Sequence, residues 1–295
     1  MRFRKDARLD QSQVEDLRGR RMGGAPMALG GGGIVSVIVV LAILLLGGNL
    51  GGGGGLGGLG DLAGQTAGTG TPAATLEHCQ TGADANEYED CRILAVVNSV
   101  QKYWGTALRG YEPARTRFFD GAVSTACGTA SSAVGPFYCP ADRYVYIDLG
   151  FFDQLESFGG SSGPLAQAYV LAHEYGHHVQ NLTGVLQRAD NRDTGPQGAA
   201  VRVELQADCY AGAWVANAMR TGLIEEITRA DIQDALTSAA AIGDDRIQKM
   251  AGRRVNPESF THGSSAQRVE WFKRGMDAGD PNACDTYKAA SRVTN

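Results

Sequence analysis

The chain has 295 residues, a formal net charge of −5 and a pI near 5.6. This acidic balance argues against a nucleic-acid partner, because binding to phosphate groups requires a clustered basic surface and the chain beyond its N-terminus has none. About 220 residues follow the first apolar run and the glycine-rich stretch behind it, which is enough for one domain with a sizeable core.

Three N-terminal segments precede that domain. Residues 1–26 hold seven Arg and Lys against four acids with almost no apolar periodicity, and we interpret them as a cytoplasmic basic tail. Residues 27–47 include the apolar run 34–46 and are long enough to cross a bilayer as one transmembrane helix. Residues 48–75 are dominated by Gly and cannot bury enough apolar area to order themselves, so we expect a flexible linker.

The distribution of charge sets the orientation of this predicted helix. No Lys or Arg follows the apolar run until Arg92, which places the N-terminus in the cytoplasm and residues 76–295 outside the membrane. A cleavable signal peptide is the alternative, since an apolar core of this length also fits one. The long leading segment and the lack of an A-x-A-like cleavage site favour an uncleaved membrane anchor.

All six cysteines follow the apolar run, as expected for disulfides formed in an oxidising compartment. Six cysteines allow fifteen pairings. Short loops favour the first two of the pairs Cys79–Cys91, Cys127–Cys139 and Cys209–Cys284, and elimination leaves the third. A second metal site built from cysteines is disfavoured, because the chain has no C-x-x-C pair.

Residues 76–295 are expected to form an α+β domain, mostly helical with a small sheet. Aromatic and β-branched residues predict strands at 117–119 and 143–149. Helices are predicted at 87–108, at the apolar run 165–182 and at 199–219. Capping boxes at Thr228 and Ser264 open two more, and the first of these is expected to continue to Lys249.

The apolar run 165–182 contains His173-Glu174-Tyr175-Gly176-His177. On a helix the two His lie about 40° apart on one face, so both imidazoles can reach a single zinc ion. Glu174 lies roughly 80° from their midpoint, where it can act as general base on water activated by the metal without occupying the coordination sphere. The spacing therefore predicts a catalytic zinc site.

A catalytic zinc takes three protein ligands, so the third must come from another segment. Glu204 and Asp208 lie at i and i+4 on one face of the Ala- and Val-rich segment 199–219, where burying unpaired carboxylates is costly. We predict Glu204 as the third zinc ligand and Asp208 as the acceptor of the free N–H of a ligating His. A simply exposed helix face is the alternative interpretation.

His262 lies in a loop that runs into the helix opened by Ser264. A His at this position is predicted to donate a hydrogen bond to the oxyanion that forms during hydrolysis. A hydrogen-bonded loop histidine without a catalytic role fits the sequence equally well. His178 points about 120° away from the ligand pair, so we expect it to lie outside the ligand set.

These motifs resemble the neutral zinc metallopeptidase family of bacterial membrane-anchored proteins, and the resemblance covers nearly the whole chain. It is carried by the N-terminal span, Cys127-Gly128, the Gly-Pro-Phe-Tyr-Cys-Pro segment 135–140, Val-Tyr-Ile-Asp at 145–148, residues 173–178, residues 204–209 and His262-Gly263. More broadly, H-E-x-x-H followed by E-x-x-x-D is similar to the gluzincin branch of zincin peptidases. The resemblance implies a zincin-like fold with His173, His177 and Glu204 as ligands, Glu174 as base and Asp208 behind them.

The sequence therefore predicts a membrane-anchored zinc metalloendopeptidase that cleaves a peptide or protein substrate outside the cytoplasm. We expect a strand at 144–148 to pair with the extended substrate. The alternative from another class is a membrane-tethered binding domain with a structural zinc site. Glu174 argues against it, because a purely structural site does not use that carboxylate.

Overall fold

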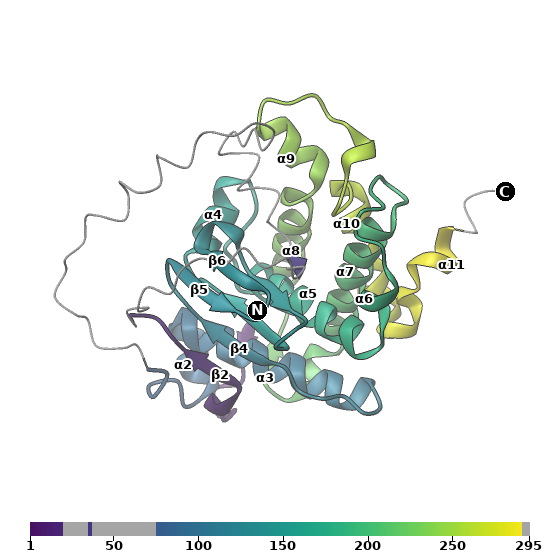
Figure 1. Cartoon of the computed structure of the whole chain (residues 1–295). Helices are drawn as coiled ribbons and strands as arrows, with labels where there is room; N and C mark the ends of the chain where they lie inside the picture. The colour runs from purple at the N-terminus through teal and green to yellow at the C-terminus, as the bar shows by residue number, and fades with distance from the viewer. Residues whose placement is uncertain (20–34, 37–74, 291–295) are drawn as a thin grey trace, which may run out of the picture.

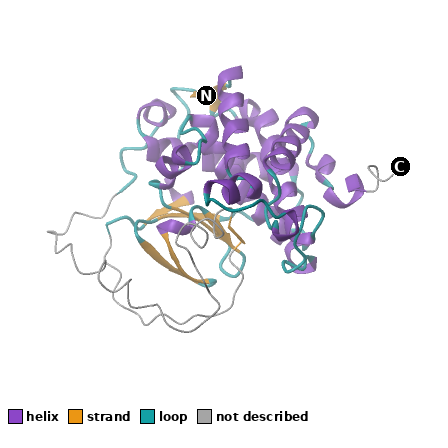
Figure 2. Cartoon of the chain, turned by 90° about the horizontal axis from the view of Figure 1, so that it is seen from above, coloured by secondary structure: helices purple, strands orange, loops and turns teal. Residues whose placement is uncertain are grey.

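The computed structural model describes residues 1–19, 35–36 and 75–290 (Figure 1). The architecture is mixed α+β, with the strands gathered on one side and most of the helices on the other (Figure 2). The transmembrane helix expected at 27–47 and the linker expected at 48–75 fall almost entirely outside the described residues. Among the helices that are described, none is both long and apolar enough to cross a membrane.

Within the described residues the largest sheet has five strands in the order β2-β4-β8-β7-β3. Their bounds are β2 Val14–Asp16, β4 Arg115–Phe118, β8 Tyr144–Ile147, β7 Phe137–Cys139 and β3 Val35–Ser36. β2, β4 and β8 run parallel, whereas β7 is antiparallel to both β8 and β3. The smaller sheets pair β5 (Ala122–Thr125) with β6 (Gly128–Ser131), and β1 (Arg2–Phe3) with β9 (Ile224–Glu226). β4 and β8 confirm the two strands predicted from aromatic and β-branched residues.

The position of β8 contradicts one expected role. β8 pairs with β4 on one edge and with β7 on the other, so it has no free edge for a substrate. The prediction that a strand at 144–148 binds the substrate is therefore wrong. β7 is the strand that packs against α5 (Pro164–Leu182), and its outer edge pairs with Val35 and Ser36.

Besides α5, the long described helices are α3 (Glu89–Ala107), α7 (Ala199–Asn217), α8 (Arg229–Ala241) and α10 (Ser265–Ala278). Shorter ones are α2 (Gly82–Glu87), α4 (Phe151–Ser157), α6 (Val185–Arg188), α9 (Asp244–Met250) and α11 (Thr286–Ala290). α5 begins with Pro at its first position, where a missing N–H costs nothing, and its apolar residues pack against α3, α7 and α8. α5 is therefore the centre of the helical layer.

Both predicted capping boxes are present, at the start of α8 and at the start of α10. The helix expected from Thr228 to Lys249 is instead divided into α8 and α9. The chain turns at Gly243, and this turn leaves Asp244 at the start of α9 with its carboxylate facing the backbone of residues 261–263.

The six cysteines form three disulfides, Cys79–Cys91, Cys127–Cys139 and Cys209–Cys284. This confirms the predicted pairing. The first bridge fastens the start of the domain to α3, and the third fastens α7 to the segment behind α10. Three buried bridges of this kind are typical of an oxidising compartment.

Residues 1–19 do not form the separate tail that their basic composition suggested. β1 pairs antiparallel with β9, and β2 adds a parallel strand to β4. Phe3 and Val14 are buried in the core. The segment is extended and held largely through its backbone, so it needs few apolar side chains and shows no periodicity for a sequence pattern to detect.

Candidate metal centre

α5 and α7 bring three metal-ligating side chains together. His173 and His177 lie on one face of α5 and are fully buried, and Glu204 faces them from α7. Glu204 Oε2 lies 3.1 Å from His173 Nε2, and Glu204 Oε1 lies 3.6 Å from His177 Nε2. One ligand atom from each residue lies within 4.8 Å of the other two. The structure thus assembles the three ligands proposed from the sequence.

Gly176 sets how closely the two helices approach. It lies between the two histidines on α5, and a Cβ atom there would come within 3.0 Å of Ala207 Cα on α7. Because a side chain at this position would push α7 away, glycine keeps Glu204 within reach of both imidazoles.

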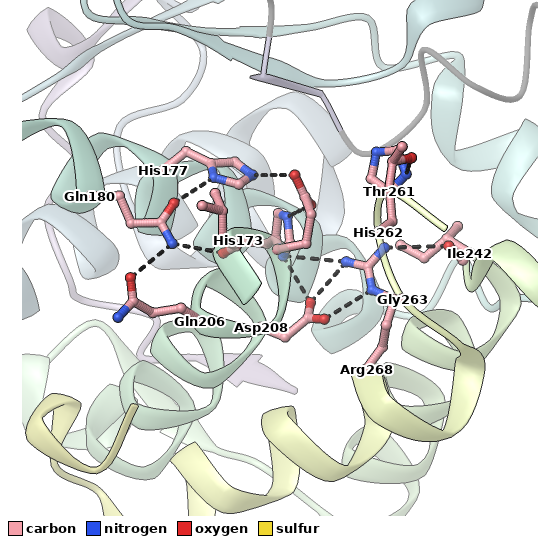
Figure 3. A network of polar contacts seen from close by, with 12 residues as sticks. His173, His177, Gln180, Gln206, Asp208, Ile242, Thr261, His262, Gly263 and Arg268 are labelled. Carbon is pink, nitrogen blue, oxygen red and sulfur yellow. Dashed lines mark hydrogen bonds and ion pairs between the residues drawn. The ribbon is translucent and has the colours of Figure 1, made fainter. Parts of the chain in front are cut away.

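Hydrogen bonds place a proton on the Nδ1 atom of each imidazole (Figure 3). His173 Nδ1 lies 2.8 Å from Asp208 Oδ1, and His177 Nδ1 lies 2.8 Å from Gln180 Oε1. Gln180 presents its oxygen to the ring, because its Nε2 donates to the Val203 carbonyl at 2.7 Å. In its neutral form each imidazole is then an acceptor at Nε2.

This arrangement fits a bound cation. The Nε2 lone pairs of His173 and His177 point toward the Glu204 carboxylate, and His177 Nε2 has no hydrogen bond to any described residue. Buried lone pairs and a carboxylate repel one another unless a cation lies between them. Two imidazole nitrogens and one carboxylate oxygen form a ligand set of catalytic zinc, with a fourth position left open.

A buried arginine holds Asp208 as a carboxylate. Arg268 on α10 is fully buried and donates to both oxygens of Asp208, from Nε and from Nη2, at 2.9 Å each. Burial alone would raise the pKa of Asp208, but Arg268 and His173 outweigh burial and bring this pKa below its ordinary value. Tyr169 adds a hydrogen bond of 2.6 Å. An ionised Asp208 keeps the Nδ1 proton on His173 and so maintains the ligating tautomer.

Sequence reasoning missed both Arg268 and Gln180. A buried Asp208 requires a counter-charge, yet α10 also carries exposed basic residues, and nothing in the sequence separates Arg268 from them. Gln180 had a usable signal. It lies three residues after His177, a spacing that places both side chains on the same side of a helix.

Glu174 is fully buried beside the three candidate ligands, and neither of its oxygens has a hydrogen bond within the described chain. Burial raises the pKa of Glu174 well above its ordinary value, and the neighbouring His173 opposes this rise. The backbone N–H of Tyr138 on β7 does not meet hydrogen-bond geometry toward Glu174, but it still favours the ionised form slightly. A carboxylate with few partners and increased proton affinity is suited to accepting a proton.

His262 is buried and comes within electrostatic range of Glu204 from the loop before α10. Asp244 holds this loop: its Oδ2 accepts the backbone N–H groups of residues 261–263 at 2.8, 2.8 and 3.0 Å. The Oδ1 of Asp244 lies 3.4 Å from His262 Nδ1. Burial alone would lower the pKa of His262, but Asp244 and Glu204 raise it to about 9. The sequence did not indicate Asp244, because a carboxylate that binds backbone amides leaves no pattern.

His178 lies outside the ligand set, as expected. Its Nδ1 lies 2.9 Å from the Tyr138 hydroxyl and its Nε2 lies 2.6 Å from the Glu112 carbonyl. Both ring nitrogens are therefore used in fastening α5 to β7 and to the segment before β4.

Comparison with known proteins gives a family. The profile of the family described as "Putative neutral zinc metallopeptidase" matches residues 1–287. The uncharacterized protein Rv2575 of Mycobacterium tuberculosis is 54% identical over 227 residues, 74% of this chain and 78% of that protein. The uncharacterized protein YpfJ of Escherichia coli K12 is 41% identical over 229 residues, with the same coverage of 74% and 78%. No solved structure matches the chain. The near-complete profile match, on a chain that assembles two His and a Glu around one point, shows that the protein belongs to this neutral zinc metallopeptidase family.

Proposed function

We propose that the protein is a zinc endopeptidase that acts outside the cytoplasm. The proposal is carried by one observation: two Nδ1-protonated imidazoles meet a carboxylate beside a buried glutamate that makes no hydrogen bond within the described chain. His173, His177 and Glu204 would hold the metal. Zinc, when bound there, supplies a Lewis acid for the scissile carbonyl and eases the deprotonation of water. Membership of the family supports this chemistry.

Glu174 is the proposed general base. It takes a proton from the attacking water and returns it to the leaving amine. Its complete burial keeps bulk water from competing for that proton.

His262 is the proposed donor to the oxyanion. In the metal-free protein Asp244 and Glu204 raise the pKa of His262 to about 9, against the effect of burial, which favours a ring with a proton on each nitrogen. Asp244 positions it by holding the loop backbone and by facing Nδ1, so the imidazole is oriented before the substrate arrives.

We place the substrate along β7 instead of β8. β7 packs against α5, and the amide of its Tyr138 acts on the Glu174 carboxylate. Its outer edge forms an antiparallel ladder with Val35 and Ser36, so this edge is able to pair with an extended peptide. A bound substrate would replace these two residues and bring its scissile bond beside Glu174.

The three disulfides support an extracytoplasmic location. The membrane anchor expected at 27–47 stays a prediction from the sequence. A membrane-tethered binding domain with a structural zinc is the competing function, and it leaves the buried Glu174 without a role.

The test compares the full-length protein with its Glu174→Gln variant and with Glu270→Gln, an exposed control on α10. Metal analysis should find one zinc per chain in all three proteins. Mass spectrometry of a digested peptide library should show cleavage by the wild type and the control, and a loss of about 100- to 10,000-fold in Glu174→Gln. Full zinc with no cleavage by any of the three would favour the binding domain and contradict the proposal.

A further inference from the structure

Residues 1–18, which we call the N-terminal strap, lie across α2 and α3 and extend to β4 and β9. Backbone hydrogen bonds tie the strap down along its length: Arg4 N–H to the Leu223 carbonyl at 2.9 Å, Gly82 N–H to the Ala7 carbonyl at 2.8 Å, and Leu9 N–H to the Gln80 carbonyl at 3.0 Å. Backbone hydrogen bonds spread along an extended segment are typical of a peptide that is bound specifically.

Two asparagines of the domain bind the strap backbone in the same way. Asn86 accepts from the N–H of Phe3 and donates to its carbonyl, at 2.9 Å each. Asn98 does the same for Asp10, at 2.7 and 3.0 Å. Asn98 is only 6% exposed, so without the strap its amide would be left in a largely apolar surface without these partners.

The domain is also shaped around the strap. A Cβ atom at Gly82 would overlap the carbonyl oxygen of Arg4, so glycine is needed for the strap to pass over the start of α2. The side chain of Phe3 is 1% exposed and belongs to the main core. The strap is therefore part of the packing of the domain.

The basic residues of the strap have partners on the domain. Arg18 Nη2 lies 3.0 Å from Asp90 on α3, and Arg2 pairs with Glu225 and Glu226 of β9 at 3.3 Å each. The positive charge that suggested a cytoplasmic tail is thus partly explained by acids of the domain itself.

We propose that the strap and the peptidase domain of one chain form a single folded unit, so that the N-terminus and the metal centre lie on the same side of the membrane. A single crossing at 27–47 would leave residues 1–26 in the cytoplasm and separate the strap from α2, α3, β4 and β9 by a bilayer. The strap contacts and that crossing exclude each other within one chain. This inference is independent of the proposed peptidase activity, because it concerns only how the chain packs.

The first experiment traps the docked strap in the full-length protein in cells. Arg2 and Glu226 are register partners in antiparallel strands, and both side chains are about half exposed. Partners in a regular antiparallel ladder have Cα atoms about 4.5–5.5 Å apart, within the range of a disulfide, and the register irregularity of this ladder lies between Arg2 and Phe3. The Arg2→Cys/Glu226→Cys protein should form a fourth disulfide within one chain, found as a linked peptide by non-reducing mass spectrometry. The control Arg2→Cys/Lys288→Cys tests for unspecific pairing, because Lys288 lies on α11 and not on β9, the strand that pairs with β1.

The second experiment leaves the contacts intact. Lys5 and Lys288 are both exposed, so a cysteine at either site should react with a membrane-impermeant maleimide when that site faces the outside. Equal labelling of Lys5→Cys and Lys288→Cys in intact cells supports the proposal. Labelling of Lys5→Cys only after the membrane is opened would overturn it. A fourth disulfide that joins two chains, seen as a dimer on a non-reducing gel, would also overturn it, because the strap would then dock on a second copy.

Discussion

The buried pair of Asp208 and Arg268 allows fold stability and metal ligation to be separated by mutation. Both side chains are fully buried, and two hydrogen bonds of 2.9 Å join them. Removing one charge leaves the other uncompensated in the core, which costs about 3–5 kcal/mol. We therefore expect Asp208→Asn and Arg268→Met each to lower the free energy of unfolding of the zinc-free protein by about this amount. The double variant should lose at least ~2 kcal/mol less than the sum, because it retains neither charge.

We expect the same three variants to rank differently in zinc affinity than in stability. Asp208 keeps the Nδ1 proton on His173, so Asp208→Asn should weaken zinc binding about 10- to 100-fold, and the double variant should do the same. Arg268→Met leaves that carboxylate in place and should weaken binding less. Urea unfolding with the disulfides intact measures stability, and competition with a zinc chelator measures affinity. Asp190→Asn, which removes an exposed pair with Arg192, is the matched control and should leave stability close to that of the wild type.

Two results would refute this reasoning. A double variant as unstable as the sum of the single variants would show that the two residues do not act as a pair. Unchanged zinc affinity in Asp208→Asn would show that the tautomer of His173 does not depend on this carboxylate.

Three further predictions concern His262 and the disulfides. His262→Ala should retain zinc and lower kcat about 100- to 1000-fold with little change in KM, as measured by steady-state cleavage of a peptide substrate; lost stability with intact turnover would instead mark a structural loop histidine. The pKa of His262 is raised from 6.5 to about 9, so its contribution to stability is full below pH 6.5 and is lost as pH rises through 9. Urea unfolding of the zinc-free wild type should show a loss of about 3 kcal/mol over this window, and His262→Gln should not show it. Reduction should lower the melting temperature in calorimetry, most through Cys209–Cys284, whose loop of 75 residues corresponds to about 4 kcal/mol in the chain-entropy model; a Cys209→Ser/Cys284→Ser protein that melts with the wild type would contradict this.

The local parts of the site could be predicted because helix geometry fixes them. His173, Glu174 and His177 are neighbours on one helix, so their relative directions follow from the sequence spacing alone. Glu204 was reached by a burial argument: an isolated carboxylate in an Ala- and Val-rich helix needs a partner, and the structure places it against the two imidazoles. The same burial argument requires a partner for Asp208 but does not identify it, because Arg268 lies 60 residues away and no local spacing relates the two.

The failures have a common physical origin in backbone pairing. A strand pattern at 144–148 reports that both faces are buried, but it does not report whether an edge is free, and β8 is internal. The N-terminal strap is held through its backbone, in part by Asn86 and Asn98. An amide side chain that binds backbone groups places little restriction on the side chains of the bound segment, so the sequence of the strap does not reveal these contacts. The basic composition of this segment was therefore the main feature that the sequence offered, and it led to the interpretation as a cytoplasmic tail.

The third disulfide links the compartment of the protein to the chemistry of its site. Gln180, which orients His177, donates to Gln206 Oε1 at 3.0 Å, and Gln206 Nε2 donates to the Cys284 carbonyl at 3.0 Å. Cys284 is held in place by its bond to Cys209 on α7, the helix that also carries Gln206. The carbonyl at the end of this hydrogen-bonded series is thus positioned by a covalent bond that forms only under oxidising conditions. In a reducing compartment the segment around Cys284 would lose this bond, and Gln206 would lose its fixed acceptor. The tautomer of His177 that the proposed zinc ligation requires would then be less firmly held.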